Sequence, residues 1–399
     1  MKRLVLSLAM IAAVGCASPQ QQRTPPAAQP PSFQPSYGSD MGGSPVGVIP
    51  AAILHDSARN KDLEVSIEYP TRGAAPFPVI IFSPGYGGSS HGYEGLISYW
   101  TSYGYVCIRP SHADAGALGD AMRDLLAMSR DDRTNRNPSR RDRARVQAEA
   151  QARPQTNLAE AIWDKEREPQ WRDRVRDVTL IIDSLNDLEK SYPELAGKMD
   201  HARIGVGGHS YGAFTAMLTA GTKTFSNPPL ALGDPRVKAI VAMSPQGIAA
   251  NRGLTADSWK DLHVPAMFMT GTRDYGANDT EGPDWHRLGY DHAAPGDKFF
   301  VLIRGANHMT FTGIASGLGE QFDSNRSQMP MVDPRTGRET YPETQQSTRG
   351  GLPLVDRGTF ASIRSISLMF WDSYLKDKKD AKELLDPAKY AGSVEVSRK

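Results

Sequence analysis

Short continuous runs of apolar residues recur along the chain and alternate with longer segments in which apolar residues are spaced as on one face of a helix. The continuous runs predict buried strands, and the first two, separated by the polar residues 57–61, predict a hairpin. Strands that alternate with helices predict an α/β fold with a mostly parallel central sheet, flanking helices and right-handed crossovers. The predicted strands are 46–55, 63–69, 78–83, 105–109, 203–207, 237–243, 264–269 and 299–303, and the predicted helices are 95–102, 172–188, 213–220 and 360–375.

Two segments interrupt this alternation. Residues 113–170 are dense in charges of both signs, for example at Arg130-Asp131-Asp132-Arg133, and are interpreted as a charged helical insertion. Residues 316–351 form a long polar loop after the last predicted strand. Loops of this length in a compact domain are often functional, so we hypothesise that one of the two segments acts as a lid.

The N-terminus predicts export. Residues 1–16 combine a positive start with an apolar run too short to span a bilayer, as in a signal peptide. Ala13-Val14-Gly15-Cys16 resembles a bacterial lipobox, in which Cys16 is lipidated and becomes the first mature residue. The Pro-, Gln- and Ser-rich residues 17–43 predict a tether in front of a domain at 44–399. We therefore expect a protein anchored in the bacterial envelope, with a secreted or periplasmic protein as the alternative if Cys16 is not lipidated.

Composition excludes several classes of function. A formal net charge of +1 provides no field for nucleic acid or an acidic membrane, and acids are interleaved with the arginines of the insertion. Neither of two glycine-rich stretches fits a nucleotide site: Ser210 replaces the third glycine of a dinucleotide fingerprint, and 83–90 lacks the Gly-Lys-Ser/Thr ending of a phosphate loop. No Cys/His spacing suggests zinc, Cys107 is expected to be a buried free thiol, and no cofactor is expected.

The strongest candidate for chemistry is Gly208-His209-Ser210-Tyr211-Gly212, which lies between a predicted strand and a predicted helix. This arrangement is typical of a nucleophile elbow, in which the turn leaves room only for glycine beside the serine. Ser210 is then the candidate nucleophile. The backbone N–H of Tyr211, at the positive end of the following helix, is a candidate oxyanion donor.

The remaining members of a catalytic triad are expected at the ends of later strands. Asp274 follows strand 264–269 and His308 follows strand 299–303, which gives the order Ser, Asp, His found in hydrolases with this elbow. In this interpretation Asp274 orients His308, and His308 accepts the proton of Ser210. Alternative acids lie further from the strand end, at Asp279, Asp284 and Asp291.

The sequence also predicts where several histidines and the second oxyanion donor lie. His286 and His292 are expected on the surface, and His209 is expected to pack behind the site. His112 is a candidate wall of the pocket. The loop after strand 78–83 is expected to supply the second oxyanion donor, through the backbone N–H of Tyr86.

Four motifs carry a resemblance to known proteins: Ser-Pro-Gly-Tyr-Gly-Gly at 83–88, Gly-His-Ser-Tyr-Gly at 208–212, Gly-Thr-Arg-Asp at 271–274 and Ala-Asn-His at 306–308. Together they resemble the dienelactone hydrolase and platelet-activating factor acetylhydrolase-like branch of the α/β-hydrolases. Polyester hydrolases and cutinases are similar at the first two motifs, and their oxyanion donors correspond to Tyr86 and Tyr211. The chain departs from these relatives at 244–246, where polyester hydrolases usually carry a tryptophan, and in its insertion 113–170; dienelactone hydrolase itself uses a cysteine nucleophile.

The resemblance implies a serine carboxylic-ester hydrolase that acts through an acyl-enzyme on a small-molecule or lipid-like ester. An amide or peptide hydrolase with the same triad remains an alternative, because the same groups cleave both bonds. A non-catalytic binding protein on a hydrolase scaffold is the alternative from another class.

Overall fold

The computed structural model describes residues 37–116, 168–225, 230–276, 281–313, 331–332, 339–340, 357–390 and 392–399. The expected signal peptide, Cys16 and most of the tether lie outside these residues. So do most of the charged insertion 113–170 and of the polar loop 316–351.

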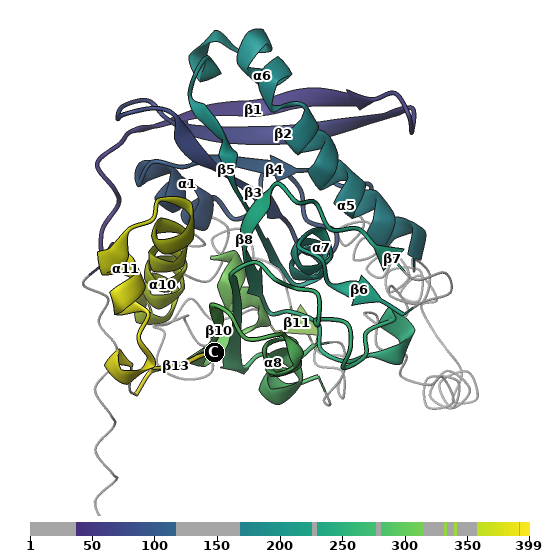
Figure 1. Ribbon diagram of the computed structural model, residues 1–399, viewed down its shortest axis with the longest axis vertical. Coiled ribbons are helices and arrows are strands. Elements are labelled where there is room, and N and C mark those ends of the chain that lie inside the picture. Colours follow the sequence, from purple (N-terminus) through teal and green to yellow (C-terminus); the bar gives the residue numbers. More distant parts are fainter. Residues whose placement is uncertain are drawn as a thin grey trace, which may run out of the picture.

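A nine-stranded sheet in the order β1-β2-β4-β3-β5-β8-β9-β10-β13 forms the centre of the fold (Figure 1). Every neighbouring pair from β4 to β10 is parallel, whereas β1, β2 and β13 pair antiparallel at the two edges. This confirms the predicted α/β class with a mostly parallel sheet. The strands are β1 (Val46–Asp56), β2 (Lys61–Pro70), β3 (Phe77–Ser83), β4 (Val106–Pro110), β5 (Met199–His209), β8 (Val237–Met243), β9 (Ala266–Arg273), β10 (Lys298–Asn307) and β13 (Val394–Arg398).

Helices cover both faces of this sheet. Figure 1 shows α10 and α11 on its left and α5, α7 and α8 on its right. None of the helices in the described part of the chain is both long enough and apolar enough to cross a bilayer. The helices are α1 (Glu94–Ser102), α5 (Glu168–Asp183), α6 (Leu185–Ser191), α7 (Tyr211–Thr219), α8 (Pro283–His292), α10 (Arg357–Leu375) and α11 (Lys379–Leu384), and two short ribbons pair β6 (Lys223–Thr224) with β7 (Leu230–Ala231) and β11 (Met331–Val332) with β12 (Glu339–Thr340).

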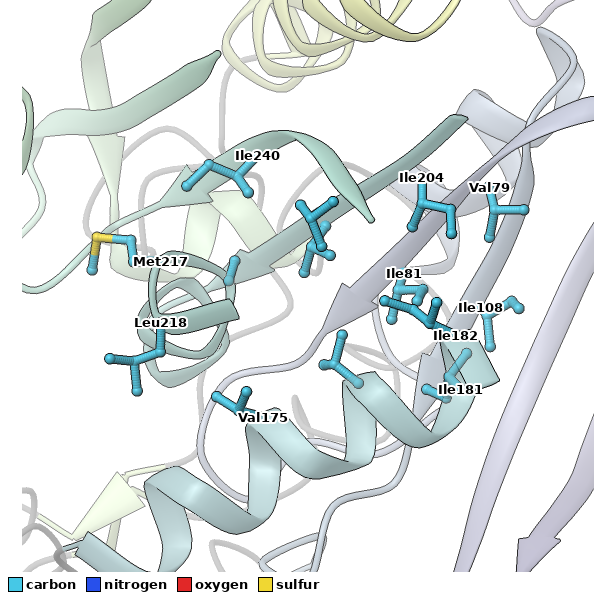
Figure 2. Close-up of a cluster of buried hydrophobic side chains, with 14 of the residues drawn as sticks. Val79, Ile81, Ile108, Val175, Ile181, Ile182, Ile204, Met217, Leu218 and Ile240 are labelled. Atoms are coloured by element: carbon cyan, nitrogen blue, oxygen red, sulfur yellow. The ribbon is translucent and has the colours of Figure 1, made fainter. Parts of the chain in front are cut away.

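The apolar side chains of strand β3 pack into two hydrophobic cores, one on each face of the sheet. Val79 and Ile81 belong to the core under α5 and α7, whereas Ile80 and Phe82 belong to the core under α1 and α10. Figure 2 shows the first of these cores, with Val175 and Ile181 of α5 beside the strands. Because successive side chains of a strand point to opposite faces, a strand covered on both sides must be apolar at every position.

The structure contains elements that the sequence did not predict, among them α8, α11 and the two short ribbons. The expected single helix 172–188 is divided at Ser184 into α5 and α6. The edge strand β13 was not predicted, because only Val394 and Val396 of its five residues are buried, and a two-residue alternation is too short to identify a strand.

The N-terminal stretch contacts the folded domain from Tyr37 onward. The Tyr37 hydroxyl donates to Oδ2 of Asp372 over 2.6 Å, and the Tyr105 hydroxyl donates to Oδ1, also over 2.6 Å. Lys376 and Lys378 lie 3.1 and 3.0 Å from the same carboxylate. Burial alone raises the pKa of Asp372, but the Lys376 ammonium and the two tyrosine hydroxyls outweigh it and hold the pKa below its usual value.

We expect Asp372→Asn to lower the free energy of unfolding by about 3 kcal/mol at pH 7, because the substitution leaves buried donors facing a neutral amide. The folded pKa of Asp372 lies below its ordinary value of 3.8, so its contribution is complete above that pH and is lost as the pH falls toward the folded pKa. Urea unfolding at pH 7 and at pH 3.5 checks this, and the difference between wild type and variant should be smaller at pH 3.5. The exposed Asp380→Asn on α11 is the control and should change stability little. An undiminished difference at pH 3.5 would contradict the role given to the carboxylate charge.

Candidate active site

The turn between β5 and α7 carries Ser210 in a strained conformation, with φ 55° and ψ −119°. Non-glycine residues seldom adopt positive φ, and when they do the surrounding structure must hold them there. A Cβ at Gly208 would lie 2.1 Å from the carbonyl oxygen of Gly212, and a Cβ at Gly212 would lie 1.9 Å from the carbonyl oxygen of Ser83. The glycines on both sides of Ser210 are therefore required by backbone packing, as expected of a nucleophile elbow.

Asp274 follows β9 directly and is fully buried. Its Oδ1 lies 3.0 Å from Nδ1 of His308, and its Oδ2 accepts hydrogen bonds from Ser244 Oγ (2.5 Å) and Thr270 Oγ1 (2.8 Å). Nε2 of His286 lies 3.5 Å from Oδ1. Burial alone raises the pKa of Asp274, but the two imidazoles outweigh it and hold the pKa well below the usual value. Asp274 is therefore an ionised carboxylate at neutral pH.

His308 begins a 3₁₀ turn after β10 and is the most exposed member of this group, with 32% of its side chain accessible. The preceding Asn307 caps the turn through a reciprocal pair of hydrogen bonds with Thr310, which fixes the backbone at His308. Since Nδ1 of His308 faces Asp274, Nε2 lies on the opposite side of the ring. An imidazole held in this way can accept a proton at Nε2.

His209 connects this pair to the elbow. Its ring lies 4.7 Å from the His308 ring, centroid to centroid, and Ser210 is the next residue in the chain. The Tyr93 hydroxyl accepts the Gly85 N–H over 3.0 Å and lies 2.9 Å from Nδ1 of His209. Burial, together with the neighbouring His308, lowers the pKa of His209 to about 3, so the ring is neutral. His209 is a packing residue behind the site, as expected from the sequence.

Ser244 was not predicted as part of the site. It follows β8 with φ 55°, and its Oγ lies 2.8 Å from Nδ1 of His308 as well as 2.5 Å from Asp274. The sequence contained one indication, because Ser244 stands at the carboxyl end of a predicted strand, as Asp274 and His308 do. The structure thus brings the ends of β8, β9 and β10 together around one imidazole.

The expectation that His286 lies on the surface was wrong. This residue is only 1% exposed, because α8 packs against β9 and turns the ring inward. Its Nδ1 lies 2.5 Å from the Pro245 carbonyl oxygen, and its Nε2 faces Asp274. His292, at the end of α8, is partly exposed.

The alternative acids do not reach this cluster within the described residues. Asp284 and Asp291 are exposed on α8, and Asp291 pairs with Arg287 over 3.0 Å. Asp279 lies outside the described residues. Among the described carboxylates considered, Asp274 is the one in contact with His308.

His112, a candidate wall of the pocket, instead belongs to a second row of Ser, His and Asp inside the fold. Its Nε2 lies 2.9 Å from Ser83 Oγ and its Nδ1 lies 2.8 Å from Asp177 Oδ2. All three side chains are buried. Burial and the nearby Arg174 cation lower the pKa of His112. Because Ser83 is fully covered, this row is a structural network beneath the loop that carries Tyr86.

The expectation for Cys107 is confirmed. Cys107 is a buried free thiol, and burial raises its pKa to about 12, so it is not a reactive nucleophile. In the ranges that the structure describes, no group of three or more His, Cys, Asp or Glu side chains is arranged to hold a metal ion.

Part of the chain matches a known protein family. The family described as "Platelet-activating factor acetylhydrolase, isoform II" matches residues 49–228, a range that contains Tyr86, Ser210 and Tyr211 and ends before Asp274 and His308. None of the curated proteins matches the chain. The mostly parallel sheet with helices on both faces is the architecture expected of the α/β-hydrolases. Fold and match together show an α/β-hydrolase fold, and over residues 49–228 the chain resembles the platelet-activating factor acetylhydrolase family.

Proposed function

We propose that this protein is a serine ester hydrolase in which Ser210 is the nucleophile, His308 the general base and Asp274 the residue that orients His308. The contact that carries the proposal is the 3.0 Å approach of His308 Nδ1 to the buried Asp274 carboxylate. The elbow conformation of Ser210 and the ring contact between His209 and His308 support it. The family match supports ester hydrolysis as the reaction.

In the proposed reaction, Ser210 Oγ attacks the ester carbonyl carbon while Nε2 of His308 takes the hydroxyl proton. The ionised Asp274 stabilises the imidazolium that forms. Collapse of the tetrahedral intermediate breaks the bond to the leaving alkoxide, which His308 protonates, and leaves an ester on Ser210. A water molecule, deprotonated by His308, then hydrolyses this acyl-enzyme and restores the serine.

The negative charge on the intermediate requires two hydrogen-bond donors. We assign them to the backbone N–H groups of Tyr211, the first residue of α7, and Tyr86, in the loop after β3. Gly212 at the start of α7 packs against the Ser83 carbonyl at the end of β3, which brings these two backbone segments together. The N-terminus of α7 also contributes the positive end of a helix dipole.

The substrate is inferred as a lipid-like carboxylic ester, because the matched family is named for the hydrolysis of such a molecule. We further propose that Cys16 is lipidated and that the part of segment 17–43 before Tyr37 tethers the domain to the bacterial envelope, because residues from Tyr37 onward pack on the domain. The sequence at 13–16 and the composition of the tether support this.

Substitution Ser210→Ala should abolish turnover of p-nitrophenyl butyrate and labelling by a fluorophosphonate, because both need the hydroxyl. Wild type should cleave the ester faster than the matched anilide. Ser57→Ala, in the exposed β1–β2 turn, is the control and should retain full activity. Labelling of the Ser210→Ala protein would remove Ser210 as the nucleophile, and faster cleavage of the anilide would favour an amide hydrolase.

Substitution Ser244→Ala should lower kcat about tenfold with little change in KM, because one hydrogen bond to a charged group contributes about 1.5 kcal/mol. The substitution removes both the donor to Asp274 and the second oxygen near His308 Nδ1. Steady-state kinetics measure the effect, with the distant buried Ser365→Ala as control. Equal kinetics for Ser244→Ala and wild type would show that Ser244 does not orient the pair.

Substitution Cys16→Ser should move the protein from the membrane fraction to the soluble fraction of a Gram-negative host and abolish its labelling by alkynyl palmitate. Lipid chains supply the affinity for the bilayer, so loss of the acylated residue leaves a soluble domain. Cys107→Ser is the matched control and should stay in the membrane fraction. If both variants stay there and Cys16→Ser is still labelled, Cys16 is not the anchor.

A further inference from the structure

Arg174 and Asp114 form a buried ion pair beneath the loop that carries Tyr86. Each side chain is only 1% exposed. Nη2 of Arg174 lies 2.6 Å from Asp114 Oδ2, and Nε lies 3.0 Å from Oδ1, so the guanidinium holds both carboxylate oxygens. Although burial alone raises the pKa of Asp114, the Arg174 cation outweighs it and lowers the pKa. A fully buried charge pair is costly unless further hydrogen bonds complete it.

These further hydrogen bonds go to the residues on both sides of Tyr86. Arg174 donates from Nη1 to the Pro84 carbonyl (2.9 Å) and from Nη2 to the Gly85 carbonyl (3.3 Å). Asp114 Oδ2 accepts the N–H of Gly87 over 2.8 Å. The two peptide groups before Tyr86 and the one after it are therefore fixed by the same ion pair.

The same guanidinium also contacts the other assigned donor residue. The Arg174 guanidinium carbon lies 4.2 Å from the centre of the Tyr211 ring, and the Tyr86 and Tyr211 rings lie 6.2 Å apart. An arginine over an aromatic face is attracted by the ring quadrupole. Helix α5, which carries Arg174, packs against α7, which begins at Tyr211.

We propose that Arg174, paired with Asp114, is a positioning residue that sets the distance and orientation between the two oxyanion donors. The inference rests on the proposed function, because it concerns the stabilisation of the tetrahedral intermediate at Ser210. Arg174 does not touch the substrate. It holds the main chain at Pro84 and Gly85 and the ring of Tyr211, and it thereby fixes the N–H groups of Tyr86 and Tyr211 relative to each other.

Charge alone is not sufficient for this task. The guanidinium makes bonds in several directions of one plane, to two carboxylate oxygens and two carbonyls, whereas a lysine ammonium is a single point with three donors. A lysine at position 174 keeps the positive charge in the cavity but cannot make all of these contacts together. Oxyanion donors must lie within about 3 Å of the developing charge, and a misplacement of about 1 Å can lower the rate by about two orders of magnitude.

Arg174→Lys should therefore lower kcat by about 10- to 100-fold with KM changed less than about threefold. The affinity for a trifluoromethyl ketone, whose adduct with Ser210 resembles the tetrahedral intermediate, should fall by the same factor as kcat/KM. A merely structural role would not produce this proportionality, because it would reduce the amount of folded enzyme without changing the affinity of the folded fraction.

The matched control is Arg109→Lys. Arg109 forms a comparably buried pair with Glu68, 2.7 Å apart and 3% exposed on both sides, and contacts Gly92 instead of the residues beside Tyr86. This variant should lose stability but keep kcat and inhibitor affinity. All measurements are made on the full chain at a temperature well below the unfolding transition of each variant.

Should Arg174→Lys not fold, Asp114→Asn provides the second variant, since it keeps an acceptor for the Gly87 N–H but removes the charge opposite Arg174. A kcat within twofold of wild type for the folded Arg174→Lys or Asp114→Asn protein overturns the inference, as does an equal loss in Arg109→Lys. Failure of the proposed function is distinguishable, because wild type itself would then be inactive or resist labelling by fluorophosphonate.

Discussion

The close approach of α7 to the end of β3 is the constraint from which the candidate site is built. The start of the helix lies so near the strand that a single methyl group at Gly212 would overlap the Ser83 carbonyl oxygen at 1.9 Å. This contact holds the turn at Ser210 in a conformation that a serine would not adopt alone, and it places the loop after Ser83 beside the helix N-terminus. The backbone strain at Ser210, the proposed nucleophile, and the position of the loop proposed to supply the second oxyanion donor thus have one common cause.

Each of the buried carboxylates at the carboxyl edge of the sheet is in contact with several hydrogen-bonding or charged partners. Asp274 accepts hydrogen bonds from two hydroxyls and lies next to two imidazoles. Asp114 accepts hydrogen bonds from the Arg174 guanidinium and from a backbone N–H. Burial imposes a desolvation free energy on each charge, and the hydrogen bonds and ion pairs with several partners offset it. Because every partner must stay in place for the charge to stay buried, these networks also fix the geometry of the loops they contact.

The sequence predicted the parts of this structure that depend on local pattern. Continuous apolar runs identified the parallel strands, and the glycines beside Ser210 identified the elbow, since both follow from the chain itself. It did not predict Ser244 or the burial of His286, because these depend on how β8 and α8 pack against β9. Nor did it assign Arg174, which stands in an amphipathic pattern like any surface arginine until the loop after β3 is folded over it.

The range of the family match, 49–228, contains the parts of the candidate site that depend on the main chain and excludes those that depend on side chains at strand ends. The turn at Ser210 and the loop at Tyr86, to which we assign the nucleophile and an oxyanion donor, are main-chain features that require particular glycines and the pairing of β3 with β5. The match at 49–228 contains both. The proposed acid and base, Asp274 and His308, require a side chain of the right chemistry at the ends of the paired strands β9 and β10. A backbone arrangement constrains many neighbouring residues at once, whereas a strand-end side chain constrains few. Sequence similarity is therefore expected to persist longest around Ser210 and Tyr86, and less around the proposed acid and base, Asp274 and His308.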